Sequence, residues 1–159
     1  MKRWLKAIIL IYLSLLFFGS FLAISILLTG FLEKSLPFIP QIKNFLYYFF
    51  SGAIGGSLRH LYMFCSHYME DELQDYRKWI MYIFYPIFAT GTAVMAVTLI
   101  HSGFLLIEFT DYGNTPYGAI SIAFIVGFGF NRFLNLLNAI SKNLFKSKNG
   151  NQNKSEIDN

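Results

Sequence analysis

Cysteine and charge are what this sequence has least of. It contains one cysteine, Cys65, which excludes an intramolecular disulfide framework and a metal cluster built from several cysteines. Only 14% of its 159 residues are charged and 55% are hydrophobic, whereas soluble domains are about 25% charged. A water-soluble globular fold is therefore excluded.

The apolar residues gather in long blocks that are nearly free of charge. A bilayer core about 30 Å thick is crossed by roughly 20 helical residues. We predict an all-α, polytopic membrane protein in which residues 1–146 form a four-helix transmembrane domain. The four transmembrane helices are expected at about 7–31, 44–68, 79–101 and 116–145. Residues 147–159 offer no apolar face, so we predict a disordered cytoplasmic tail there.

The positions of Lys and Arg predict the orientation of these helices. With the N-terminus in the cytoplasm, nine Lys and Arg lie on the cytoplasmic side and only Lys34 and Lys43 lie opposite, leaving aside two arginines within the spans. Positive charge accumulates on the cytoplasmic side of membrane proteins. We therefore expect both termini inside, in a bacterial inner membrane. Because topology accounts for the net charge of +4, we expect the lipid bilayer as a partner and no direct nucleic-acid binding.

Small residues recur at helical spacing in the predicted second span. Ser51, Gly52, Gly55 and Gly56 are three and four residues apart, so they share one face and allow another backbone to approach closely. This face either packs helices together or lines a lumen or ligand contact, and it suggests a homo-oligomer. The predicted packing positions are Ser51, Gly52, Gly55, Gly56, Gly91, Gly127 and Gly129.

Two arginines lie inside predicted spans. Arg59, beside His60, and Arg132 both fall in the inner half of the bilayer, so they can share one site. An arginine at the centre of a span costs about 2.5–3.5 kcal/mol on insertion scales. The pair can snorkel to lipid phosphates, form salt bridges with the acidic connection at 70–75, or bind an anion or lipid headgroup.

A polar stripe surrounds Arg132 on the predicted fourth helix. Asn131, Asn135, Asn138 and Lys142 recur every three or four residues, which puts them on one face. Either the helix has already left the bilayer there and offers a docking surface, or the stripe lines a water-filled or subunit-facing surface. The residues predicted to bind a cytoplasmic protein partner are Glu70, Asp71, Glu72, Asp75, Lys142 and Lys146.

Catalytic chemistry finds little support in the sequence. His60, His67 and His101 lack an evident carboxylate partner, and two histidines without a third ligand are a weak indication of a metal site. We therefore predict no enzyme activity, no catalytic residues, no metal and no cofactor.

Short motifs between Ser51 and Phe145 resemble a loosely defined group of small bacterial inner-membrane proteins. They comprise Gly52-x-x-Gly55-Gly56-x-x-x-His60, Trp79-x-x-Tyr82-x-x-x-Pro86, Tyr117-Gly118 and Gly127-Phe-Gly129. The resemblance implies a multi-span fold without an agreed reaction. In size, span number and charged cytoplasmic elements the chain is also similar to the membrane component of the Kiwa anti-phage system.

Three functions are compatible with this pattern. The leading hypothesis is a non-enzymatic membrane subunit that anchors or signals to a cytoplasmic partner in anti-phage defence. The first alternative is an oligomeric ion-conducting pore that depolarises the membrane, lined near Gly56, Arg59 and Arg132. The second is a holin-like lysis protein.

Overall fold

The computed structural model describes residues 3–31, 33, 36–70, 78–103 and 117–150, without the side chains of Lys78 and of 144–150. All of its regular secondary structure is helical. The helices are α1 (Arg3–Leu28), α3 (Ile39–Met69), α4 (Lys78–His101), α5 (Tyr117–Phe128) and α6 (Phe130–Gly150). The chain divides into two compact units, Met1–Gly129 and Phe130–Asn159.

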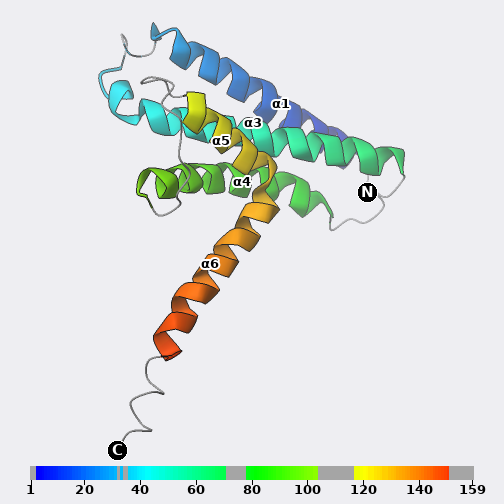
Figure 1. Cartoon of the computed structure of the whole chain (residues 1–159). Coiled ribbons are helices and arrows are strands. Elements are labelled where there is room, and N and C mark those ends of the chain that lie inside the picture. Colours follow the sequence, from blue (N-terminus) through cyan, green and yellow to red (C-terminus); the bar gives the residue numbers. More distant parts are fainter. Residues whose placement is uncertain (1–2, 32, 34–35, 71–77, 104–116, 151–159) are drawn as a thin grey trace, which may run out of the picture. The chain divides into compact units, whose positions relative to one another are not determined.

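Helix α3 is the centre of the first unit, where it contacts α1, α4 and α5 (Figure 1). Helix α1 runs antiparallel to it, since the Lys6 ammonium near the start of α1 lies 5.2 Å from the ring centroid of Tyr68 near the end of α3. Helix α4 is also antiparallel to α3. The ring of His101 at the end of α4 contacts the ring of Tyr48 in the first half of α3 edge-on, with 5.9 Å between the ring centroids. This alternation agrees with the predicted order of the first three helices.

Two apolar clusters fill the space between these helices. One joins Ile9 and Leu13 of α1 to Phe64 of α3 and Tyr82 of α4. The second lies toward the other end of α3 and brings in α5. Its buried members are Leu27, Ile39, Tyr47, Tyr48, Ala93, Val97 and Ala123.

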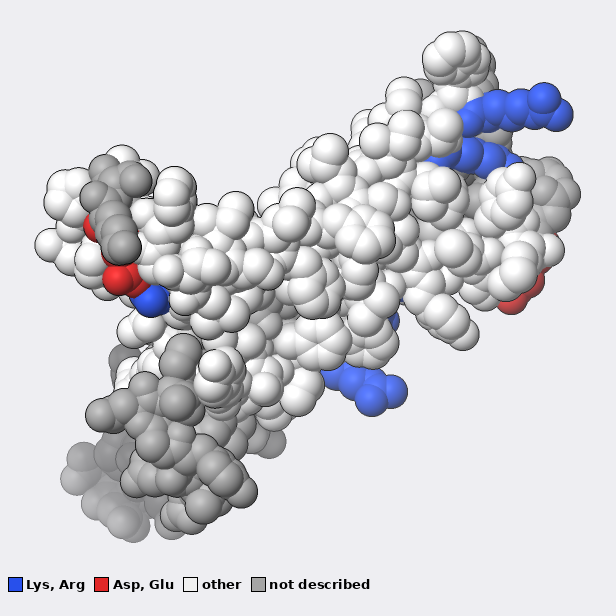
Figure 2. All heavy atoms as spheres, turned by 90° about the horizontal axis from the view of Figure 1, so that it is seen from above, with Lys and Arg blue, Asp and Glu red and all other residues white. Residues whose placement is uncertain are grey.

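The outside of this unit is as apolar as its inside. On α1, Leu15 is 71% exposed, Phe18 64% and Leu22 65%. Figure 2 shows charged side chains toward the two sides of the view and a few basic ones near its middle, while most of the remaining described surface is uncharged. Soluble proteins rarely expose an apolar surface of this extent, whereas a bilayer covers it. The surface is therefore consistent with that of a membrane protein.

Two of the described helices are long and apolar enough to cross a membrane, α1 and the part of α4 from Trp79 to His101. A third span results if α5 and the segment Phe130–Asn143 count as one interrupted helix. Helix α3, predicted as the second span, does not meet this criterion. Its tyrosines, serines, Arg59 and His60 lower its apolarity, and its neighbours cover the middle of the helix.

Helix α1 runs from Arg3 to Leu28 rather than over the predicted 7–31, and three further helix boundaries also differ from those predicted. Helix α3 begins at Ile39 rather than near residue 44, because Pro40 in the first turn has no intrahelical hydrogen bond to lose. In place of the predicted helix 116–145 there are two helices, α5 and α6. They are interrupted at Gly129, because glycine is a poor helix former. Helix α6 continues to Gly150, so the first four residues of the predicted tail are helical. Residues 151–159 lie outside the described residues.

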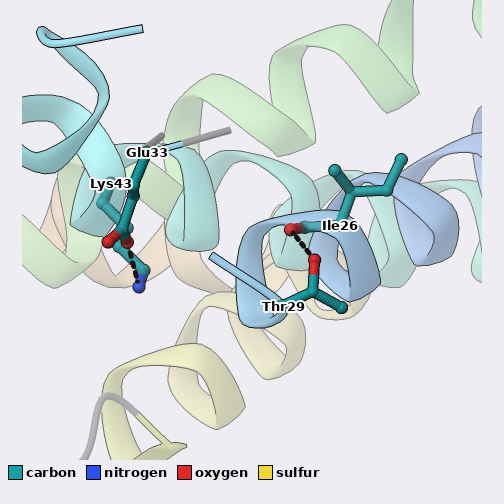
Figure 3. Close-up of polar contacts among 4 residues, drawn as sticks. All are labelled: Ile26, Thr29, Glu33 and Lys43. Atoms are coloured by element: carbon teal, nitrogen blue, oxygen red, sulfur yellow. Dashed lines mark hydrogen bonds and ion pairs between the residues drawn. The ribbon is translucent and has the colours of Figure 1, made fainter. Parts of the chain in front are cut away.

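The connection between α1 and α3 is held by local polar contacts (Figure 3). Gly30 has a φ of +68°, a left-handed conformation that suits glycine after a helix end, and the Thr29 hydroxyl donates to the Ile26 carbonyl at 2.7 Å. The Lys43 ammonium donates to a Glu33 carboxylate oxygen at 2.5 Å. This hydrogen bond is the main reason that the pKa of Lys43 is raised above its ordinary value of 10.5.

Candidate functional site

The predicted glycine face of α3 is the packing seam of the first unit. A Cβ atom added at Gly52 would collide with the Ala93 side chain of α4, and one added at Gly56 would lie 2.9 Å from the Ala89 Cβ. At Gly55 it would collide with the Phe124 carbonyl oxygen of α5. Residues 51–57 are all buried. Helices of the same chain therefore cover this face.

Helices α3 and α5 are parallel and in a constant register. The Ser51 hydroxyl donates to the Ile120 carbonyl at 2.6 Å, Gly55 lies against the Phe124 carbonyl, and Arg59 donates to the Phe128 carbonyl at 3.0 Å. Each pair is separated by 69 residues in the sequence, and successive contacts on each helix are four residues apart. One face of α3 therefore meets successive carbonyls along one face of α5.

Arg59 completes the C-terminal end of α5. The last four carbonyls of a helix have no intrahelical partner, and a cation near them also interacts favourably with the helix dipole. The Arg59 Nη1 atom donates to the Phe128 carbonyl, and the Gly129 amide donates to the Ile125 carbonyl at 2.7 Å. Arg59 therefore supplies a side-chain donor to a carbonyl at the end of α5.

His60, next to Arg59, is 2% exposed and bonded within its own helix. Its Nδ1 atom lies 2.7 Å from the Gly56 carbonyl oxygen. Because a carbonyl can only accept, Nδ1 carries the proton. Its ring contacts Tyr85 edge-on at 5.9 Å. No group of three or more metal-ligating side chains occurs in the part of the chain that the structure describes.

A third polar contact lies beside Pro86 in α4. Proline has no amide hydrogen, so a helical carbonyl one turn earlier loses its donor and the local hydrogen bonds are disturbed. The Tyr12 hydroxyl of α1 donates to the Ile83 carbonyl at 3.1 Å, and the Thr90 hydroxyl donates to the Pro86 carbonyl at 2.7 Å. The Ile83 and Pro86 carbonyls therefore accept side-chain hydrogen bonds in the two turns that adjoin the proline.

Helix α6 has two distinct faces. Successive helical residues are about 100° apart, so Phe133, Leu134, Leu137 and Ile140 form one apolar face. The opposite face is polar and exposed; it consists of Asn131, Arg132, Asn135, Asn138, Lys142 and Asn143. The amide stripe is therefore an exposed face within α6.

The remaining predicted site residues fall into three groups. Gly91 faces open space and does not pack against another helix among the described residues, whereas Gly127 packs closely against Gly52. Glu70 is exposed and accepts a hydrogen bond from the Ser66 hydroxyl at 3.0 Å. Asp71, Glu72, Asp75 and the side chain of Lys146 lie outside the described residues.

Two contributors to this arrangement were missed from the sequence. Tyr12 was the only residue with a phenolic hydroxyl in the first apolar block, and that signal could have marked it as a donor. The Phe128 carbonyl is a backbone group that has no sequence signature. Arg59 and Arg132 belong to different compact units, so a site shared by the two arginines stays a prediction.

Comparison with known proteins gives no relative for this chain. No protein-family model matches it, and neither a curated protein nor a solved structure matches it. What the chain does must therefore be inferred from its own geometry and chemistry.

Proposed function

We propose that this chain is a non-enzymatic membrane subunit that anchors or signals to a cytoplasmic protein, with the polar face of α6 as its main docking surface. The observation that carries the proposal is the polar face of α6, whose residues from Asn131 to Asn143 are exposed. A row of amides offers both donors and acceptors to a protein surface, whereas it would be costly in hydrocarbon. The predicted orientation puts this face on the cytoplasmic side.

The packing of the first unit supports a structural role rather than a catalytic one. Its small residues are used for close helix packing, and its polar side chains Tyr12, Ser51 and Arg59 bond to backbone carbonyls. No buried side-chain nitrogen or oxygen lacks a partner among the described residues. Unpartnered polar groups aimed at a cavity would instead favour a substrate site.

The pore alternative receives less support. The face near Gly56 that could have lined a lumen is filled by α4 and α5 within the described part of the chain. A pore would have to form between copies, but the glycines from which a homo-oligomer was predicted already pack internally, Gly91 and Gly129 excepted. We therefore retain the subunit hypothesis as the proposal.

In-cell photocrosslinking tests the docking surface. A photoreactive amino acid at Asn138 is expected to crosslink one specific soluble protein in native membranes. The matched control is Asn44, an exposed amide near the start of α3 that the predicted topology puts on the opposite side. Equal crosslinking from both positions, or none from Asn138, contradicts the proposal. Loss of the specific product in Asn135→Ala/Lys142→Ala assigns the contact to the polar face.

We extend this proposal to anti-phage defence on the resemblance to the Kiwa membrane component. Cells carrying the gene with its native neighbours are expected to reduce phage plating, and deletion of this gene alone should restore plaques. The Asn135→Ala/Lys142→Ala variant should behave like the deletion while its membrane level stays unchanged. If phage plating is the same with and without the gene, the defence assignment is wrong, although the docking proposal stands on its crosslinking test.

A further inference from the structure

The apolar face of α6 carries an inference beyond the proposed docking of a protein on its polar face. Phe133, Leu134, Leu137 and Ile140 lie at positions i, i+1, i+4 and i+7, and together they cover an arc of roughly 120°. Leu136 adds apolar surface at its edge and is 47% exposed. This face is wider than the seam of a coiled coil, which uses two positions in seven.

The charge of α6 is of one sign. Arg132, Lys142, Lys146 and Lys148 lie in the helix, and no acidic residue occurs between Phe130 and Gly150. A second copy of α6 seated on the apolar face would bring two basic helices together without any compensating acidic residue in either helix. An anionic surface would instead be attracted to it. Charge complementarity therefore favours a negatively charged lipid surface over a second copy.

The length of α3 gives the depth at which α6 begins. Arg59 is 16 residues after Lys43, which corresponds to about 24 Å along the helix. If Lys43 marks the outer boundary of a core about 30 Å thick, the end of α5 at Arg59 lies roughly 6 Å below the inner boundary. Interfacial helices bury their apolar faces about 5–10 Å into this zone. Because Phe130 follows α5 after a single residue, α6 starts at the required depth.

We propose that α6 lies in the inner-leaflet interface, with its apolar face in the acyl boundary and its positive charge attracted to anionic phospholipid headgroups. The amides of its polar face then stay open to the cytoplasm. Anionic lipid thereby orients the surface that the proposed partner recognises. This inference concerns the apolar face and the lipid, so it can fail while the protein-docking proposal stands.

Fluorescence of a polarity-sensitive probe on the full chain tests the lipid proposal. In a Cys65→Ser background, the probe is attached through Ile140→Cys on the apolar face or Asn138→Cys on the polar face. The protein is reconstituted at one copy per nanodisc, in phosphatidylcholine with or without phosphatidylglycerol. The Ile140 probe is expected to move to an apolar environment only with phosphatidylglycerol, and high salt should reverse this change by screening. The Asn138 probe should stay in water throughout.

Charge variants separate headgroup recognition from simple apolar burial. Each neutralised basic residue should weaken the lipid-bound state roughly fivefold, and Arg132→Gln/Lys142→Gln/Lys146→Gln roughly 100-fold. The matched control Arg132→Lys/Lys142→Arg/Lys146→Arg keeps the charge and should keep the response. An Ile140 probe in water in both lipids overturns the proposal. An Ile140 probe that is shielded equally in both lipids, or shielded only with two copies per disc, also overturns it, because protein then covers the face.

Discussion

At the scale of single residues, the bond from Arg59 to the Phe128 carbonyl has a direct energetic consequence. Arg59→Leu leaves the end of α5 without this donor, and a hydrogen bond from a charged group is worth about 1.5–3 kcal/mol. We expect the free energy of unfolding to fall by about 2 kcal/mol, measured by SDS titration in mixed micelles. Arg132→Leu is the matched control. Equal destabilisation by the two substitutions would contradict the capping role of Arg59.

Gly55 and Gly91 form a second matched pair of residues. Gly55→Ala puts a methyl group against the Phe124 carbonyl, so α3 and α5 must separate, and such overpacking costs about 1–3 kcal/mol. The methyl group of Gly91→Ala would point into open space. This substitution should stabilise α4 by up to about 1 kcal/mol, because alanine has a higher helix propensity than glycine. The same SDS titration measures both. A similar loss of unfolding free energy in both variants would contradict the close packing of α3 on α5 as the cause of the Gly55→Ala effect.

The Lys43–Glu33 contact makes a prediction about pH. Because the folded-state pKa of Lys43 is raised above 10.5, its stabilising contribution is complete below that pH and is lost as the pH rises through the folded value. In Glu33→Gln, the pKa of Lys43 should fall toward its ordinary value. Titration of the Lys43 side chain by NMR in micelles checks this. An unchanged titration midpoint of Lys43 in Glu33→Gln would show that Glu33 does not raise the pKa of Lys43.

At the scale of helices, the sequence predicts the elements better than their ends. Long uncharged blocks and the spacing of Gly52, Gly55 and Gly56 predict helices and a packing face, because helix geometry fixes both. The interruption at Gly129 was not predicted, since glycines at 127 and 129 also occur inside membrane helices. The role of Arg59 was not predicted either, because its acceptor is a backbone carbonyl that only the register of α3 and α5 brings near.

The contact between α1 and α4 gives a prediction at this scale. Tyr12→Phe removes the donor to the Ile83 carbonyl and should cost about 1 kcal/mol of unfolding free energy. In a Pro86→Ala background, the regained amide hydrogen of residue 86 would bond to the Tyr82 carbonyl and not to that of Ile83, so the cost of Tyr12→Phe should stay about 1 kcal/mol. A double-mutant cycle in mixed micelles measures the coupling. A cost that shrinks clearly in the Pro86→Ala background would contradict this prediction and show that the Tyr12 bond compensates for the proline.

At the scale of the whole molecule, the parallel register of α3 and α5 bears on topology. Two parallel neighbours in a bundle with short connections imply an odd number of crossings between them, and the single helix α4, which runs antiparallel to α3, supplies it. If α3 runs inward, α5 also runs inward, and the chain after it begins on the cytoplasmic side. This direction agrees with the excess of Lys and Arg predicted there. The charge distribution therefore supports the inward direction of α3, and the parallel register extends that direction to α5.

Cysteine accessibility in intact cells tests this topology through single sites in the Cys65→Ser background. Trp4→Cys and Asn143→Cys should react with a membrane-impermeant maleimide only after permeabilisation, whereas Gln41→Cys should react in intact cells. Gln41 and Asn143 are both exposed polar residues, so a difference between them reports the side of the membrane rather than burial. Reaction of Asn143→Cys in intact cells would put α6 outside. The inner-leaflet lipid site and the cytoplasmic docking surface would then both be wrong, because each requires α6 to follow an inward-running α5.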